Sequence, residues 1–384
     1  MPDEGRAPLI HKIQEEIRQK GRMTFARFME RALYDPEEGY YTSSGERIGL
    51  GGDYYTSPEV HPMFGRLLAK QIRQMETLLP GPGPFTILEM GAGKGLLARD
   101  ILAGLKTDAP EDFRRFRYAV IERSPAMAAR QKALLAFSDL ASPVRWYSDI
   151  EEVQAGGSLV GCVLSNELVD AFPVHRVVAT KDGLDEIYVD VDGDRFVETR
   201  EVPSTPDLEA YFKRLKIRLA EGQRAEVNLE AARWIREVGK ALDLGFVITI
   251  DYGYPASELF APHRKKGSLL CYYRHTVNDD PYARIGEQDI TAHVDFTGLA
   301  RAGAEAGLSV TGFTNQLNFL MSLGIAREME RFDPESPEML SVKRLLARES
   351  MGGVFKVLIQ HKGLTPPPLE GLTFRPYFND VLAG

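Results

Sequence analysis

Short apolar runs alternate with amphipathic helices from residue 85 onward, and this alternation constrains the fold more than any other feature of the sequence. The runs lie at 85–88, 118–121, 144–147, 162–164 and 246–250. Apolar runs of this length, separated by helices, are typical of parallel strands whose helical crossovers cover both faces of the sheet. The sequence therefore predicts an α/β fold built on a buried, doubly covered sheet.

The stretch between the fourth and fifth runs has a different pattern. Apolar and polar side chains alternate there around two hairpin turn sequences, Lys181-Asp182-Gly183 and Asp192-Gly193. Two amphipathic helices follow, and the second carries Trp234. The pattern predicts a small antiparallel sheet with two helices, inserted after the fourth strand.

The segments on either side of this region extend the prediction. Residues 1–80 favour helices, interrupted at 34–60 by a segment that is dense in Gly, Tyr and Ser and has no periodicity. Loops of this length inside a compact protein are commonly functional. After residue 251 we expect a long polar loop, then a helix near 296–306 and a final strand pair at 308–313 and 354–360.

Charge and composition exclude several classes of protein. The 384 residues include 47 basic and 55 acidic side chains, and the net charge of −8 argues against binding nucleic acid with the whole surface. Two cysteines cannot build a disulfide scaffold or a cysteine-rich zinc site. No stretch approaches ~18 apolar residues, so we expect no membrane span. The first residues lack the features of a signal or transit peptide, so we expect a cytoplasmic bacterial protein.

A glycine-rich loop, Glu89-Met-Gly-Ala-Gly-Lys-Gly95, follows the first apolar run directly. A Walker loop needs Ser or Thr where the chain has Gly95, so this is not a Walker loop. A dinucleotide-binding fingerprint needs glycine where the chain has Leu96, so the match to that fingerprint is weak. The loop resembles the acidic-x-Gly-x-Gly-x-Gly loop of S-adenosylmethionine-dependent methyltransferases at Glu89, Gly91, Gly93 and Gly95. An acid at this strand tip is suited to hold the methionyl ammonium group, although such glycines also occur for packing alone.

Two further acids follow the next strands. Glu122 ends the second strand, where a carboxylate can accept hydrogen bonds from both ribose hydroxyls. The dinucleotide-binding fold uses an acid at the same place, so Glu122 does not discriminate between the cofactors. Asp149 and Ile150 follow the third strand and look like the methyltransferase segment that holds adenine, with Asp149 accepting from the amino group. Asp149 is equally suited to be a helix N-cap or a solvated loop acid.

The fourth strand ends in Ser165-Asn166-Glu167, and Asp170 follows three residues later. Ligands of open α/β sheets bind beyond the carboxyl ends of the strands, which places Asn166 near the cofactor. Glu167 and Asp170 can face one side of a turn. Two carboxylates beside a methyl donor suit a cationic substrate such as a guanidinium, which they would hold in bidentate fashion. The alternative is a capped turn with solvated acids.

Stretches along most of the chain are similar to the MidA-like methyltransferase family, which includes the mitochondrial complex I assembly methyltransferase and bacterial relatives. Besides the glycine loop, the similarity lies at 23–29, 34–41, 52–60, 165–174, 250–253 and 286–296. The resemblance implies a seven-stranded Rossmann-like class I methyltransferase sheet with N-terminal helices and an inserted α+β subdomain after strand four. It implies S-adenosylmethionine as cofactor and a protein substrate, which for the mitochondrial member is a subunit of a respiratory complex.

The resemblance also implies contacts from other loops. The residues placed over the cofactor are Gly52, Asp53, Thr56 and Ser57. We expect Phe172 to contact the substrate, and we expect the rings of Tyr40, Tyr41, Tyr54 and Tyr55 either to wall its channel, since aromatic faces attract cations, or to pack in the core.

His293 and Asp295 close the last of these stretches. We expect them to border the substrate channel; the alternative is a helix N-cap at Asp295 and a neutral, packed His293. Together with Glu287 and Asp289 they do not complete a recognised metal spacing, so we predict no metal site.

The sequence as a whole predicts an S-adenosylmethionine-dependent methyltransferase, with protein arginine N-methylation as the leading activity and Glu167, Asp170 and Asn166 as its catalytic residues. A methyltransferase of a small molecule or of another protein side chain, a non-catalytic assembly factor and, more distantly, a nicotinamide-dependent oxidoreductase stay open as alternatives. Nothing in the sequence indicates the oligomeric state.

The predicted segments are 1–84 (N-terminal helices and cofactor-covering loop), 85–174 (first part of the core), 175–242 (substrate-side insertion), 243–363 (second part of the core) and 364–384 (tail).

Overall fold

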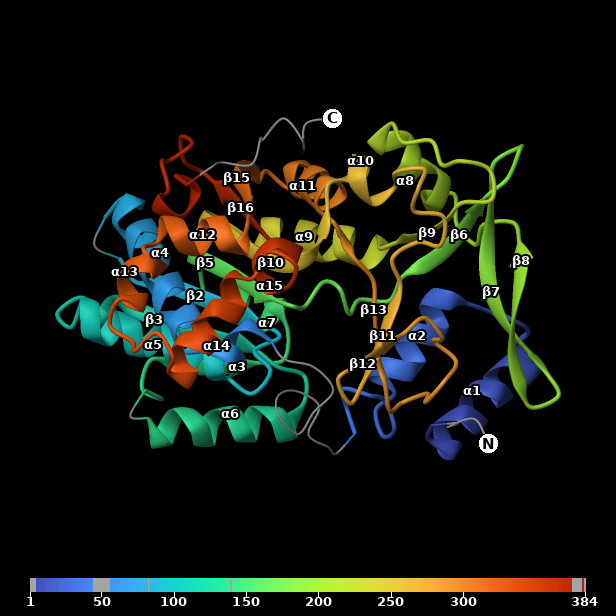
Figure 1. The fold of residues 1–384 in the computed structure, drawn as a ribbon, viewed down its shortest axis with the longest axis horizontal. Helices are drawn as coiled ribbons and strands as arrows, with labels where there is room; N and C mark the ends of the chain where they lie inside the picture. Colours follow the sequence, from blue (N-terminus) through green and yellow to red (C-terminus); the bar gives the residue numbers. More distant parts are fainter. Residues whose placement is uncertain (1–4, 44–55, 82, 139, 375–381, 383–384) are drawn as a thin grey trace.

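The computed structural model describes residues 5–43, 56–81, 83–138, 140–374 and 382 (Figure 1). The predicted contacts from Gly52, Asp53, Tyr54 and Tyr55 lie outside the described residues. Figure 1 shows two halves: one is built on a central sheet, and the other gathers the N-terminal helices, the inserted hairpins and a small third sheet.

The central sheet contains all five predicted apolar runs as strands. Its inner strands are parallel, and only β16, near one edge, runs antiparallel to its neighbours β10 and β15. The strands in sheet order are β15 (Ser309–Asn315), β16 (Phe355–Lys362), β10 (Leu242–Tyr254), β5 (Leu159–Asn166), β2 (Phe85–Met90), β3 (Phe116–Ile121) and β4 (Val144–Tyr147).

Helices cover both faces of this sheet, which is why its inner strands read as continuous apolar runs. On one face the apolar core includes α3 (Ser57–Val60), α4 (Met63–Leu78), α5 (Leu96–Asp108), α6 (Pro125–Phe137), α12 (Gln316–Ser322), α13 (Ile325–Met329), α14 (Pro337–Leu346) and α15 (Met351–Val354). The other face packs against α7 (Ile150–Ala155), α9 (Leu229–Ala241) and α11 (Phe296–Glu305). Short 3-10 turns occupy η1 (Phe113–Arg115) and η2 (Glu370–Leu372).

Local sequence explains where several of these helices begin and end. The Ser124 hydroxyl accepts the backbone N–H of Met127 at 3.3 Å, and Pro125 occupies the first turn of α6. Glycine ends the first N-terminal helix: α1 (Ala7–Lys20) stops before Gly21, which has a positive φ of 84°.

The inserted antiparallel sheet is confirmed. It consists of β6 (His175–Ala179), β7 (Leu184–Asp192), β8 (Arg195–Glu201) and β9 (Arg224–Val227), with β1 (Met23–Thr24) added at β7, and α8 (Asp207–Leu215) packs on it. The predicted division into five segments stays a prediction. In space, α1 and α2 (Phe25–Tyr34) share a core with β7, whereas α4 packs on the central sheet.

The predicted long polar loop after residue 251 is wrong. The segment holds α10 (Ala256–Leu259), β11 (Leu270–Tyr273), β12 (Thr276–Asn278), β13 (Asp289–Thr291) and β14 (Val294–Asp295). These strands are two to four residues long, too short to show alternation in a sequence. They pair with each other or with the end of β10, so tertiary contacts rather than local pattern define them.

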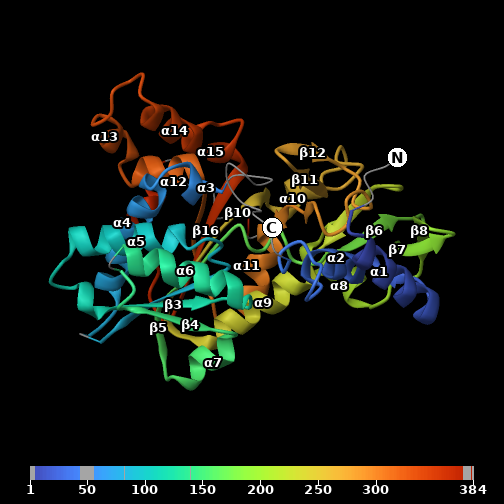
Figure 2. The same cartoon turned by 90° about the horizontal axis from the view of Figure 1, so that it is seen from below.

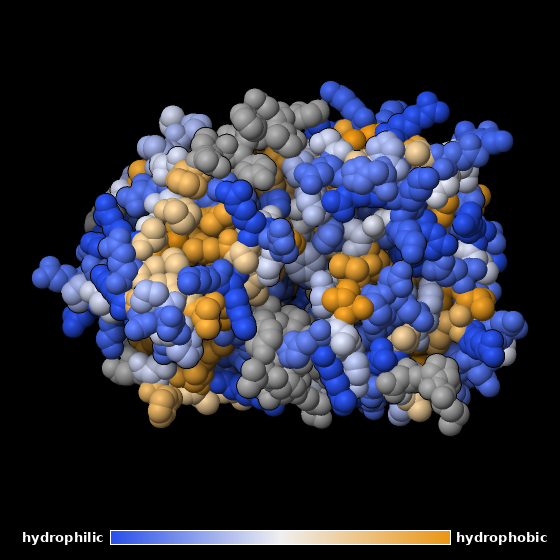
Figure 3. Space-filling model, viewed as in Figure 1, coloured by the Kyte–Doolittle hydropathy of each residue, from blue (hydrophilic) through white to orange (hydrophobic). Residues whose placement is uncertain are grey.

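Figure 2 shows the sheet of the insertion beside the N-terminal helices, with β11 and β12 above them. In Figure 3, hydrophilic side chains cover most of the face shown, and apolar side chains gather over the region of α12 to α14, where Leu340 is 55% exposed. Within the described residues, no helix is long and apolar enough to cross a membrane.

Candidate functional site

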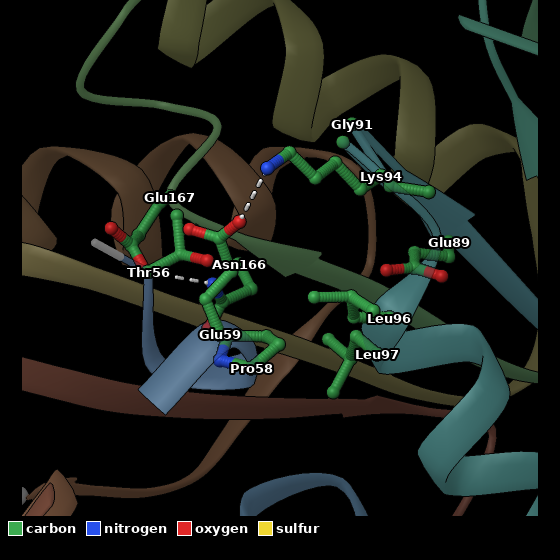
Figure 4. A pocket seen from close by; sticks show the side chains of 12 residues that line it. Thr56, Pro58, Glu59, Glu89, Gly91, Lys94, Leu96, Leu97, Asn166 and Glu167 are labelled. Atoms are coloured by element: carbon green, nitrogen blue, oxygen red, sulfur yellow. Dashed lines mark hydrogen bonds and ion pairs between the residues drawn. The ribbon is translucent and has the colours of Figure 1, made fainter. Parts of the chain in front are cut away.

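A pocket lies at the carboxyl ends of β2 and β5, where an open α/β sheet binds its ligands (Figure 4). Three elements form it: the glycine loop, the end of β5 and α3. Its lining residues are Thr56, Pro58, Glu59, Glu89, Gly91, Ala92, Gly93, Lys94, Leu96, Leu97, Asn166 and Glu167. The fold thus brings together six of the predicted site residues, namely Thr56, Glu89, Gly91, Gly93, Asn166 and Glu167.

The glycine loop needs its glycines for backbone geometry. Gly91, Gly93 and Gly95 have φ angles of 74°, 49° and 82°, a region that other residues enter only with strain. A Cβ on Gly91 would come within 2.8 Å of Leu168 Cδ1, in the turn after β5. The loop therefore leaves open backbone beside the pocket, as a ligand that contacts the main chain requires.

Glu89 lines the pocket and is 2% exposed. The Tyr118 hydroxyl donates to Glu89 Oε2 at 2.7 Å. Burial raises the pKa of this carboxyl to about 7, because the hydrogen bond from Tyr118 offsets only part of the cost of desolvating its charge. A cationic group bound beside Glu89 would favour its ionised form.

Glu122 extends from the end of β3 and is fixed at both oxygens. One oxygen accepts the backbone N–H of Ser124 at 2.9 Å, and the other accepts Gln131 Nε2 at 3.0 Å. Gln131 also donates to the carbonyl of Gly93 at 2.8 Å and accepts Trp146 Nε1 at 2.9 Å. This buried amide therefore joins the glycine loop, β3 and β4, a role that the sequence analysis missed.

Asp149 caps a helix. Its Oδ1 accepts the backbone N–H of Glu152 at 2.8 Å, at the first turn of α7, and its Oδ2 accepts the Ser148 hydroxyl at 2.9 Å. Ile150 is 7% exposed and packs in the core beneath β3 and β4. Neither residue lines the pocket described above, so their contact with adenine stays a prediction.

Glu167 follows β5 in a left-handed conformation, with a φ of 53°. Its Oε1 accepts the backbone N–H of Ser57 at 3.2 Å. The same oxygen accepts Asn166 Nδ2 at 3.0 Å (Figure 4). Burial and then the neighbouring Asp170 raise the pKa of Glu167 to about 8. A positive φ at a non-glycine residue marks backbone that the surroundings hold in place, and such residues cluster at functional sites.

Asp170 is 5% exposed and lies next to Glu167, outside the residues that line the pocket. Burial raises its pKa, although a hydrogen bond from Tyr252 favours the charged form. Asp251, at the end of β10, is fully buried beside it, and its pKa is raised by burial, by Asp170 and by Glu167. The sequence analysis did not select Asp251, yet its position at the tip of the fifth strand was a usable signal.

Besides the Ser165 hydroxyl, three buried oxygens at or beside the pocket have no hydrogen-bond partner among the described residues: Glu59 Oε2, Asn166 Oδ1 and Asp170 Oδ1. All three are acceptors. Buried polar atoms are normally satisfied, so a group of unsatisfied acceptors indicates a ligand rich in N–H or O–H donors. S-adenosylmethionine fits this requirement, since it carries an ammonium group, two ribose hydroxyls and an adenine amino group beside a sulfonium charge.

Aromatic rings stand beside these acids. The Tyr34 hydroxyl donates to the carbonyl of Ala171 at 3.0 Å, and its ring stacks on Tyr41 at 5.4 Å. Tyr41 donates to the buried carboxylate of Asp289 at 2.8 Å. Tyr40, by contrast, is completely buried in the core of the N-terminal helices, as the packing alternative predicts.

The other predicted substrate residues lie as follows. His293 is a neutral, packed histidine between the rings of Tyr252 and Tyr254, and burial lowers its pKa to about 4. Asp295 precedes α11 and accepts the Tyr211 hydroxyl of α8 at 2.5 Å. Phe172 packs edge-on against Trp234 of α9. None of the three lines the pocket, and their contact with a substrate stays a prediction.

The chain is similar to proteins of related architecture over nearly its whole length. A crystal structure from Burkholderia thailandensis bound to S-adenosyl-homocysteine is 31% identical, matches with a TM-score of 0.87, and the match covers 96% of this chain and 95% of that one. The mouse protein named protein arginine methyltransferase NDUFAF7, mitochondrial, is 28% identical over 90% of this chain and 80% of its own. The Drosophila melanogaster homologue of that protein is 28% identical over 96% of this chain and 88% of its own.

These similarities establish the α/β methyltransferase fold, with extra sheets beside the mixed central sheet, and S-adenosylmethionine as the cofactor. Residues 63–314 match the model of a family described as "Putative S-adenosyl-L-methionine-dependent methyltransferase". The match spans the glycine loop, the end of β5 and Asp251, and it begins after α3, the third element that forms the pocket. The chain therefore belongs to this MidA-like family of S-adenosylmethionine-dependent methyltransferases.

Proposed function

We propose that this chain methylates arginine side chains of a protein, and that Glu167 and Asp170 hold the guanidinium group. The observation that carries the proposal is the charge imbalance after β5. Two buried carboxylates, Asp170 and Asp251, and the half-buried carboxylate of Glu167 lie together there, and no salt bridge reaches any of them within the described residues. Buried acids without a cation are costly, so the site suits a cation that arrives with the substrate.

A guanidinium meets this requirement better than an ammonium does. Its planar, permanently charged fork of N–H donors matches two carboxylates, and the fork geometry fixes which nitrogen faces the pocket. When bound, S-adenosylmethionine supplies the methyl group. Glu167 and Asp170 would hold the guanidinium, Asn166 would lie between substrate and cofactor, and the surrounding rings would exclude water. The substrate nitrogen loses its proton after methyl transfer, so positioning and desolvation would carry catalysis.

The relatives support the same substrate class. The mouse and Drosophila proteins are named protein arginine methyltransferases, and each matches this chain over nine-tenths of its length. A protein substrate is therefore the class to test first. Because of the family resemblance, subunits of respiratory complexes head the list of targets.

The experiment uses radiolabelled S-adenosylmethionine and bacterial extract separated into protein and small-molecule fractions. We expect label in protein, released as methylarginine on hydrolysis. Glu167→Gln should reduce transfer at least tenfold with little change in S-adenosylhomocysteine affinity. Glu201→Gln is a matched control, because Glu201 lies on the exposed strand β8 and pairs with Arg22.

Three outcomes would contradict the proposal. Label in the small-molecule fraction, or on another type of side chain, would favour the alternative methyltransferases. Cofactor binding without any transfer would favour an assembly factor that keeps the fold. Unchanged transfer by Glu167→Gln on an authentic protein substrate would remove this residue from the mechanism.

A further inference from the structure

Glu59 lies in the pocket wall and has no role in the proposed function. It belongs to the single turn α3, and its side chain is 8% exposed. One oxygen, Oε1, pairs with Lys94 Nζ of the glycine loop at 3.1 Å (Figure 4). The other oxygen, Oε2, is buried and has no partner in the part of the chain that the structure describes. A buried carboxylate with a partner at only one oxygen can accept a further hydrogen bond from a ligand at the other.

The surroundings of Glu59 identify where that donor would come from. Glu59 is close enough to Glu167 to raise the pKa of that carboxyl, and it touches the glycine loop through Lys94. It therefore stands between the end of β2 and the end of β5. If the ribose lies at Glu122, as the sequence predicts, and the methyl group faces Glu167, as the proposed function requires, the cofactor's sulfur would lie near this position. The methionyl branch starts from that sulfur.

We propose that Glu59 Oε2 binds the α-ammonium group of the cofactor's methionyl branch, with Lys94 holding the carboxylate in place from its other oxygen. An ammonium offers three donors, and a charged hydrogen bond in a buried pocket is strong. Among the described residues that line the pocket, Glu89 is the competing acid, but its Oε2 already accepts the Tyr118 hydroxyl, and neither of its oxygens is a buried acceptor without a partner, as Glu59 Oε2 is. The proposal rests on the family's cofactor and not on the identity of the methylated residue.

The test is calorimetric titration of the whole chain with three nucleosides, in the absence of any protein substrate. S-adenosylhomocysteine has both the ammonium and the carboxylate of the amino acid. Its decarboxylated analogue, S-adenosyl-3-thiopropylamine, keeps the ammonium alone, and 5′-methylthioadenosine lacks both. We expect Glu59→Gln to weaken the first two ligands at least tenfold and to leave the affinity for 5′-methylthioadenosine within twofold.

The third ligand makes the result independent of folding, because a variant that still binds 5′-methylthioadenosine has an intact nucleoside site. Glu59→Asp, which keeps the charge but withdraws the oxygen, should show the same selective loss. Glu76→Gln is the matched control: Glu76 is a buried acid on α4, paired with Arg115 at 2.7 Å, and it does not line the pocket. It should lower stability without any selectivity among the three ligands.

Two results would overturn the proposal. An equal loss for all three nucleosides would mean that Glu59 shapes the pocket without contacting the amino acid. Unchanged binding of S-adenosylhomocysteine by both Glu59 variants would mean that the ammonium lies elsewhere. Since no protein substrate is present, neither result bears on whether arginine is the methylated residue.

Discussion

Asp251 Oδ2 accepts the backbone N–H of Val169 at 3.0 Å and that of Asp170 at 3.3 Å. The other oxygen of Asp251 accepts the N–H of Tyr252 at 2.9 Å. One carboxylate at the tip of β10 thus uses both of its oxygens to hold main chain, and two of the three bonds fix the turn that follows β5. That turn carries Glu167 and Asp170, so Asp251 is a positioning residue for both.

Replacing Asp251 by Asn should loosen this turn. The amide must present an N–H₂ group to a backbone N–H, which leaves buried donors unpaired at a cost of about 1–3 kcal/mol. We expect lower stability in urea and methyl transfer reduced at least tenfold, with S-adenosylhomocysteine affinity changed less than threefold. Asp243→Asn is the control, because Asp243 lies on the same strand and accepts the N–H of Leu159 at 2.9 Å, at the end remote from the pocket. Equal losses of transfer in both variants would show a general effect of instability.

Gly91→Ala should abolish measurable cofactor binding. The substitution puts a side chain at a φ of 74° and places its Cβ 2.8 Å from Leu168 Cδ1, so the backbone of the glycine loop is strained and the Leu168 side chain must move. Gly193→Ala is the control for backbone strain alone. Gly193 has a φ of 62° in a hairpin turn, and there is open space around it. We expect both variants to lose about 1–2 kcal/mol of stability from the strained backbone. Only Gly91→Ala should lose S-adenosylhomocysteine binding in calorimetry, and retained binding would show that the loop does not need this glycine.

Gln131→Leu should weaken cofactor binding about tenfold, equivalent to about 1.4 kcal/mol. The substitution removes the amide that holds Gly93, Glu122 and Trp146 together, so Glu122 loses the donor that fixes one of its oxygens. Gln71→Leu is the comparison. Gln71 is also buried, it accepts the N–H of Gly371, and it does not line the pocket. Calorimetry should show a loss of affinity only in the first variant. If both bind S-adenosylhomocysteine normally, the amide has a structural role alone.

The fold was predictable where local pattern and tertiary structure agree. The inner strands are apolar along their length because both faces are buried, and Gly21 and Ser124 end and begin helices through contacts within a few residues. The strands β11 to β13 escaped prediction because their pairing partners, not their sequences, define them.

The site was predictable at the strand ends and less so beyond them. Glu89, Asn166 and Glu167 line the pocket because they lie at the carboxyl ends of parallel strands. Gln131 and Asp251 act through residues that are 38 and 82 positions away, and no spacing rule connects such pairs. Their roles therefore required the three-dimensional structure.

The raised pKa of Glu167 makes stability depend on pH in a specific direction. The native state holds the proton more tightly, with a pKa of about 8 against an ordinary value of 4.5, so stability from this group is complete below 4.5 and is lost as the pH rises through 8. Without ligand, the wild-type chain should lose more stability between about pH 5.5 and pH 8.5 than Glu167→Gln does, since each tenfold difference in proton affinity is worth about 1.4 kcal/mol. Urea unfolding at both pH values measures this difference. Glu16→Gln is the control: Arg27 and Arg31 lower the pKa of Glu16, so its contribution is constant across this range. Parallel losses in wild type and Glu167→Gln would assign the titration to another group.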